Sequence, residues 1–170
     1  GRNVYKYEEE LVDENDSFLV DNGSYVLDEL LQYIPQDDSW EVKYGDWSAR
    51  YMHTRGLERA TIGLVKKANK AIIKRDPERF WKYYEPYMGK GYLLYNEIIL
   101  HALQFLPKSF SNRIVSYLSS DLDNKIFDFT SGSENQLELA MDVIKVHASL
   151  CDDEYLLAFE SVIIRYISPK

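Results

Sequence analysis

At 170 residues, the chain is long enough for one compact domain and too short for two ordinary ones. A hydrophobic fraction of 45%, with eight glycines and five prolines, excludes a disordered or collagen-like chain. The single cysteine, Cys151, excludes an intramolecular disulfide. There is no signal-peptide pattern, and no apolar run reaches the ~18 residues of a membrane span, so we expect a cytoplasmic protein without a membrane partner.

The net charge of −8 is concentrated at the start of the chain. Residues 1–46 carry 13 acidic and three basic side chains, whereas residues 47–170 carry 15 acidic and 17 basic ones. Residues 1–23 show no sustained hydrophobic period, so we predict an extended acidic arm or linker there. Residues 24–170 are predicted to form a single helical domain. The chain opens with Gly1 rather than methionine, which suggests a piece of a larger parent chain.

The first helix is predicted over residues 24–34, where apolar residues recur at helical spacing. Asn22 to Ser24 would cap this helix, and Pro35 would end it. A loop follows, and then a brief helix over residues 47–54.

The rest of the chain is predicted to be almost entirely helical. Asp76 and Pro77 separate two helices, because proline is well placed as the first residue of a helix. "GKG" at 89–91 is a turn, and Ser133 to Gln136 have the form of a capping box. The remaining predicted helices cover residues 57–75, 77–88, 92–106, 108–120, 134–150 and 152–167.

These helices form three successive pairs joined by short turns. Pairs that recur at roughly 30–47 residues are typical of α-solenoids of the HEAT or armadillo kind. The predicted fold is therefore all-α, with stacked antiparallel helix pairs in a right-handed superhelix.

An aromatic run, "FWKYYEPYMGKGYLLY", covers residues 80–95. On the first helix of this run the aromatic residues fall within an arc of about 160°, which indicates one buried face. Phe80, Tyr84 and Tyr87 are predicted core residues. Trp81 and Tyr83 lie at the two edges of the arc, and they are candidates for contact with a partner protein.

A basic stripe runs along the predicted helix 57–75, opposite its apolar face. It is either a solvated face, a docking site for the acidic arm or an acidic partner protein, or a nucleic-acid or phosphate site. The last reading is disfavoured because no glycine-rich loop or nucleic-acid motif accompanies the stripe. Its members are Arg59, Lys66, Lys67, Lys70 and Lys74, with Arg55 just ahead of the helix.

No constellation of residues indicates catalysis, so we predict a protein that is not an enzyme and has no cofactor or metal. Glu97 and His101 are four residues apart, but the zinc motif H-E-x-x-H is absent, and an ordinary surface pair is favoured. Cys151 is interpreted as a packed thiol at a helix turn. Asn96 lies within an apolar face and is predicted to fix the packing register.

The segment "GDWSARYMHTRGLERATIGLVKKANKAIIKRDPERFWKYYEPYM", followed by "YNEIILHALQFLP", resembles the degenerate helical-repeat region of large bacterial STAND-type NTPases, including antiviral ones. The resemblance covers residues 25–168 in style rather than in an exact motif. It implies a sensor or scaffold region, with the nucleotide-hydrolysing domain elsewhere in a longer chain, since no Walker motif is present here.

Three hypotheses follow from the sequence. The leading one is a non-catalytic helical-repeat module that recognises another protein, as part of a larger bacterial defence or signalling protein. The second is an acidic immunity-type inhibitor that neutralises a basic toxin through its acidic arm. The third is nucleic-acid or phosphate binding through the basic stripe.

Overall fold

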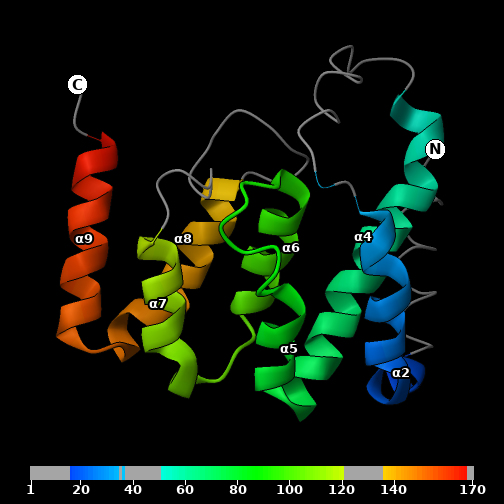
Figure 1. The fold of residues 1–170 in the computed structure, drawn as a ribbon, viewed down its shortest axis with the longest axis horizontal. Helices are drawn as coiled ribbons and strands as arrows, with labels where there is room; N and C mark the ends of the chain where they lie inside the picture. Colours follow the sequence, from blue (N-terminus) through cyan, green and yellow to red (C-terminus); the bar gives the residue numbers. More distant parts are fainter. Residues whose placement is uncertain (1–15, 35, 37–50, 121–135, 168–170) are drawn as a thin grey trace.

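The computed structural model describes the backbone of residues 16–34, 36, 51–120 and 136–167 (Figure 1). Within these residues the chain forms α-helices and short 3-10 helices and no strand, so the prediction of an all-α fold is confirmed there. The α-helices are α2 (Asp16–Leu30), α4 (Tyr51–Arg75), α5 (Pro77–Tyr84), α6 (Leu93–Leu103), α7 (Ser111–Ser119), α8 (Gln136–His147) and α9 (Asp153–Ile167). The 3-10 helices are η1 (Leu31–Tyr33), η2 (Lys108–Phe110) and η3 (Ala148–Leu150).

The first helix begins earlier than the sequence predicts. α2 starts at Asp16, so residues 16–23, which were predicted as part of the extended arm, are helical. Leu19 and Gly23 explain the difference, because both are buried. They extend the buried face of the helix toward its N-terminus, ahead of Ser24. A Cβ atom at Gly23 would lie 3.3 Å from the Ala68 carbonyl oxygen, so glycine permits the close approach of α2 to α4. Residues 1–15 of the predicted arm lie outside the described residues.

Two other helix boundaries differ from the predicted ones. α4 is one continuous helix from Tyr51, although separate helices over 47–54 and 57–75 were predicted. α5 was predicted to end near residue 88, but it ends at Tyr84, two residues before Pro86. Gly89 and Gly91 follow with positive φ angles of 74° and 69°. The predicted turn at 89–91 is thus confirmed. The predicted capping box from Ser133 lies mostly outside the described residues.

The start of α5 is formed as predicted. Pro77 is its first residue, and the Asp76 side chain accepts a hydrogen bond from the Arg79 backbone N–H at 3.2 Å. This cap fixes the corner between α4 and α5.

The helices lie in a row, with α2 at one end and α9 at the other (Figure 1). α2 packs on α4, α4 contacts α5 and α6, α6 contacts α8, and α7 contacts both α8 and α9. The ends of α6 and α8 meet the start of α7, where His147 contacts Leu103 and Ser111. α6 and α8 therefore run in the same direction within the row.

The hydrophobic core extends along this row from Leu19 in α2 to Phe159 in α9. α6 lies in the middle of it and buries nearly all of its side chains, as its apolar sequence predicts. None of the helices in the described part of the chain combines the length and apolar character that a membrane crossing requires.

Candidate functional site

The predicted basic stripe faces α6 over part of its length. The Lys66 ammonium donates to a Glu97 carboxylate oxygen at 2.9 Å, and the two side chains are 13% and 5% exposed. The Lys70 ammonium lies 4.1 Å from the centre of the Phe105 ring, a cation–π contact. These two lysines therefore make contacts within the chain, which corrects the expectation of one continuous outward row.

The other members of the stripe differ in their surroundings. Lys67 is half-buried, whereas Lys74, near the end of α4, is exposed. Arg55 and Arg59 belong to the first part of α4, where the structure describes the backbone only. The hypothesis of nucleic-acid binding loses support, because it requires several lysines free to reach phosphates.

Trp81 is a core residue, which corrects its prediction as a partner contact. It is 3% exposed and contacts the rings of Phe80 and Tyr117 edge-on. The Arg113 guanidinium of α7 covers its ring at 4.3 Å from the centroid. Trp81 lies at the edge of the aromatic face of α5, and it is buried because α7 packs beside α5.

Tyr83, the other predicted contact, is half-buried between two helices. Its hydroxyl donates to the Ser24 carbonyl oxygen of α2 at 3.3 Å. The Arg79 guanidinium lies 5.9 Å from the centre of its ring. Tyr83 thus ties α5 to α2 and has a neighbouring cation on its face.

Neither Glu97 nor His101 is exposed, so the surface location favoured for this pair is wrong. Glu97 is buried and paired with Lys66, whereas His101 is half-buried with its ring 5.4 Å from that of Phe105. Asn96 is fully buried, as predicted. The polar arc of α6 is therefore an internal surface against α4.

A second buried polar contact joins α4 to α5. The Asn69 amide nitrogen lies 2.8 Å from the Tyr84 hydroxyl, and the amide oxygen lies 3.0 Å from the same hydroxyl. Both residues are fully buried, and burial raises the pKa of Tyr84 well above its usual range. The hydroxyl therefore stays neutral and acts as a structural hydrogen-bonding group.

His147 and Ser111 form a third buried contact. The His147 Nε2 donates to the Leu103 carbonyl oxygen at 3.0 Å, because that oxygen can only accept. Nδ1 then accepts from the Ser111 hydroxyl at 3.0 Å, as in a nucleophile and base pair. Both side chains are buried, so no substrate reaches the hydroxyl. Burial lowers the pKa of His147, and the neutral ring joins the ends of α6 and α8 to the start of α7.

Cys151 is a packed thiol at the turn after η3, in agreement with its interpretation. Its sulfur lies 3.2 Å from the Ala148 carbonyl oxygen, to which it donates. Burial raises the pKa of this thiol, so the reactive thiolate is disfavoured.

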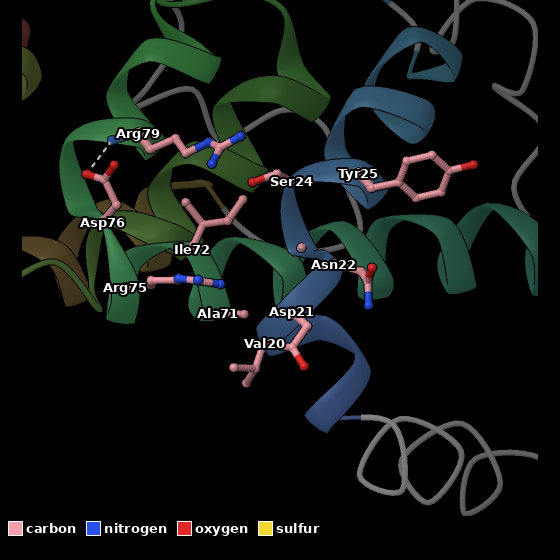
Figure 2. A pocket seen from close by; sticks show the side chains of 11 residues that line it. Val20, Asp21, Asn22, Ser24, Tyr25, Ala71, Ile72, Arg75, Asp76 and Arg79 are labelled. Carbon is pink, nitrogen blue, oxygen red and sulfur yellow. Dashed lines mark hydrogen bonds between the residues drawn. The ribbon is translucent and has the colours of Figure 1, made fainter.

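A cavity of about 620 Å³ lies between α2 and the corner where α4 meets α5 (Figure 2). We call it the corner pocket: it is lined by residues 20–25 of α2 and by Ala71, Ile72, Arg75, Asp76 and Arg79. Sequence reasoning missed Arg75 and Arg79, although the break at Asp76 and Pro77 places two arginines on either side of one corner. The position of α2, which closes the pocket, carries no local sequence signal.

The two end helices expose apolar side chains on their outer faces. On α2, Phe18 and Tyr25 are 51% and 62% exposed, and on α9, Leu157 and Ile164 are 61% and 64% exposed. Each pair is seven residues apart, so its members lie about 20° apart around the helix and two turns apart along it. We call these pairs the α2 stripe and the α9 stripe.

The fold and these surfaces define an all-α protein that uses polar groups inside its helix row and exposes apolar stripes at both ends. Nowhere in the described ranges are three or more His, Cys, Asp or Glu side chains grouped to hold a metal ion. No protein-family model, curated protein or solved structure matches the chain.

Proposed function

We propose that the chain is a non-catalytic helical-repeat module that binds another protein through the outer faces of its end helices. The observation that carries this proposal is the pair of apolar stripes. Exposed apolar side chains that lie together on one face favour contact with another surface, and a row of helices offers such faces at its two ends.

The order of contacts supports the helical-repeat part of the proposal. α4, α6 and α8 contact one another in succession, and α7 contacts α9. The succession α4, α6 and α8 would form one layer of stacked helix pairs, and the contact of α7 with α9 would form part of a second layer, as in an α-solenoid. The resemblance to STAND-type NTPases would make this module a sensor or scaffold region of a larger bacterial defence protein.

An acidic inhibitor of a basic toxin is a second candidate, favoured by the charge around the α2 stripe. Asp21, Asp28 and Glu29 are exposed on the same side of α2 as Phe18 and Tyr25. A basic partner would meet apolar and acidic side chains together on this helix. Such binding would weaken steeply with added salt.

A photo-crosslinking experiment tests the proposal. A photoreactive phenylalanine analogue would replace Leu157, Ile164, Phe18 or Tyr25 in turn, with Lys82 on α5 as the exposed control position. We expect one defined protein to be crosslinked from the stripes and not from position 82. Equal crosslinking at all positions would contradict the proposal.

The crosslinked protein would then be purified and its affinity measured by calorimetry. We expect the double variant Leu157→Glu with Ile164→Glu to bind at least about tenfold more weakly if the α9 stripe is used, because two buried apolar contacts are lost. The control Ala158→Glu is exposed on the same helix but outside the stripe, and it should keep its affinity. The matching variants at Phe18 and Tyr25 test the α2 stripe, and unchanged affinity in both double variants would overturn the proposal.

A further inference from the structure

The corner pocket presents two arginines on one wall. Arg75 is the last residue of α4 and Arg79 lies in the first turn of α5, so the short connection between the helices brings both to the same corner. Both side chains extend from this corner toward α2 (Figure 2). Both are exposed, and neither makes an ion pair with another residue in the described part of the chain.

The contacts around the pocket hold this wall in place. Asp76 accepts from the Arg79 backbone N–H, so its carboxylate serves as the cap of α5. The Tyr83 ring lies beside the Arg79 guanidinium, and the Tyr83 hydroxyl ties α5 to Ser24 of α2. The two helices that form opposite walls are thus connected directly.

The chemistry of the lining favours a carboxylate over a phosphate. A guanidinium donates two parallel hydrogen bonds to either group. Asp21 and Asp76 also line the pocket, so the four charged side chains sum to zero, and the pocket offers no excess positive charge to a doubly charged phosphate. Ala71 and Ile72 provide apolar lining, which suits the methylene groups of an acidic side chain.

Tyr25 connects the pocket to the outer face of α2. It lines the pocket and is also one of the two residues of the α2 stripe. The Tyr25 ring points away from the two arginines, so a protein segment on this stripe lies beside the pocket at Tyr25 (Figure 2). A volume of about 620 Å³ falls in the usual range of ligand pockets, about 300–1,000 Å³, and is larger than one acidic side chain requires.

We infer that the corner pocket receives an aspartate or glutamate side chain from a segment of a partner protein, with Arg75 and Arg79 binding the carboxylate. This inference rests on the proposed function, because the ligand belongs to the partner that covers the α2 stripe. It adds a polar specificity site to an interface otherwise defined by apolar side chains.

An NMR titration of the full chain tests the inference with defined probes. The probes are the blocked peptide acetyl-Ala-Glu-Glu-Ala-amide, its glutamine counterpart, and inorganic phosphate, all at the same ionic strength. We expect the glutamate peptide to shift the Arg75 and Arg79 side-chain N–H signals and the Gly23 amide signal in a saturable way. Saturable shifts with phosphate but not with the glutamate peptide would overturn the assignment, as would equal shifts with the glutamine peptide.

Charge variants separate the pocket from general electrostatics. Arg75→Gln with Arg79→Gln should weaken binding of the glutamate peptide at least about tenfold, whereas Lys74→Gln removes one charge next to the pocket and should change affinity less than about twofold. Because both arginines are exposed, the fold of the double variant should persist, and its circular dichroism spectrum checks this. The single variant Arg79→Gln is measured in the same way. Equal weakening in the Lys74 variant would overturn the inference.

Failure of the inference and failure of the proposed function give different results. The variant Leu157→Glu with Ile164→Glu keeps the pocket intact, so it should bind the glutamate peptide normally whether or not it binds the partner. If the partner binds the stripes but the glutamate peptide leaves the arginine signals unchanged, the pocket inference alone is wrong.

Discussion

The middle of the helix row and its two ends distribute polar and apolar side chains in opposite ways. Between α4 and α6, the charged groups of Lys66 and Glu97 are packed inside the protein. On α2 and α9, large apolar side chains such as Tyr25 and Ile164 face solvent. In the middle, the neighbouring helices supply the partners of the polar groups, whereas at the ends no described helix covers the apolar ones.

The buried polar residues of this row form hydrogen bonds and ion pairs that connect one helix to another. Two of these buried polar contacts join helices that are distant in sequence, with Lys66 and Glu97 separated by 31 residues and Ser111 and His147 by 36. The contact between Asn69 and Tyr84 instead joins the consecutive helices α4 and α5. Satisfied polar contacts inside a protein fix one packing arrangement, because a shifted helix would leave the same groups unpaired. The apolar stripes impose no such condition within the chain.

Among the polar contacts, the largest expected effect comes from breaking the ion pair between α4 and α6. Glu97→Gln leaves the Lys66 ammonium without its carboxylate in a largely buried position, so we expect the free energy of unfolding to fall by about 3 kcal/mol in urea denaturation. The control is Asp142→Asn in the exposed pair with Lys145, which should cost less than about 1 kcal/mol. Replacing both buried partners, Lys66→Met with Glu97→Leu, should recover most of the loss.

Equal losses in the Glu97 and Asp142 variants would contradict the view that the two ion pairs differ in kind. The double replacement adds a second criterion, because it removes both charges and keeps apolar packing at both positions. A loss in the double variant as large as in Glu97→Gln would show that an unpaired Lys66 charge is not the cause of the loss in Glu97→Gln.

A smaller effect is expected from the pH dependence of the contact at His147. Since the folded state lowers the pKa of His147 below its ordinary value of 6.5, the unfolded chain binds the proton more readily. The free energy of unfolding should therefore fall as the pH decreases below about 6.5, by at most about 1.4 kcal/mol per pH unit for this group. Denaturation curves at pH 7.5 and 5.5 measure the change.

The variant His147→Gln isolates this contribution, because glutamine keeps a donor and an acceptor but does not titrate. Its stability should change less than that of the parent chain between the two pH values. An identical change in both proteins would show that other groups cause the pH dependence.

Local chemistry determines which parts of the fold the sequence predicts. The start of α5 was predicted because Asp76 and Pro77 act within one turn of the helix. The burial of α6 follows from apolar residues around most of its circumference. The start of α2 was missed because residues 16–23 show no sustained hydrophobic period on their own, and α4 packs against this helix at Gly23.

The candidate site was less predictable, because distant helices decide the surroundings of each residue. Trp81 was expected at a surface, but Arg113 and Tyr117 of α7 cover its ring. Lys66 was expected outside, but Glu97 of α6 pairs with it. Arg75 and Arg79 gain a pocket only through the position of α2. Periodicity predicts that a residue lies on a given face of its helix, and the neighbouring helix then determines whether that face is solvent.

The smallest expected effect on stability concerns the α9 stripe, which represents the exposed apolar side chains at the ends of the helix row. Leu157→Gln with Ile164→Gln should change the free energy of unfolding by no more than about 0.5 kcal/mol per residue, because both side chains are already in water. Phe159→Ala on the same helix removes a buried ring and should cost about 3–5 kcal/mol. If the stripe variant were as destabilised as Phe159→Ala, the stripe would be part of this chain's own core. A stable stripe variant would show that Leu157 and Ile164 contribute little to the fold, which leaves them free to contact another surface.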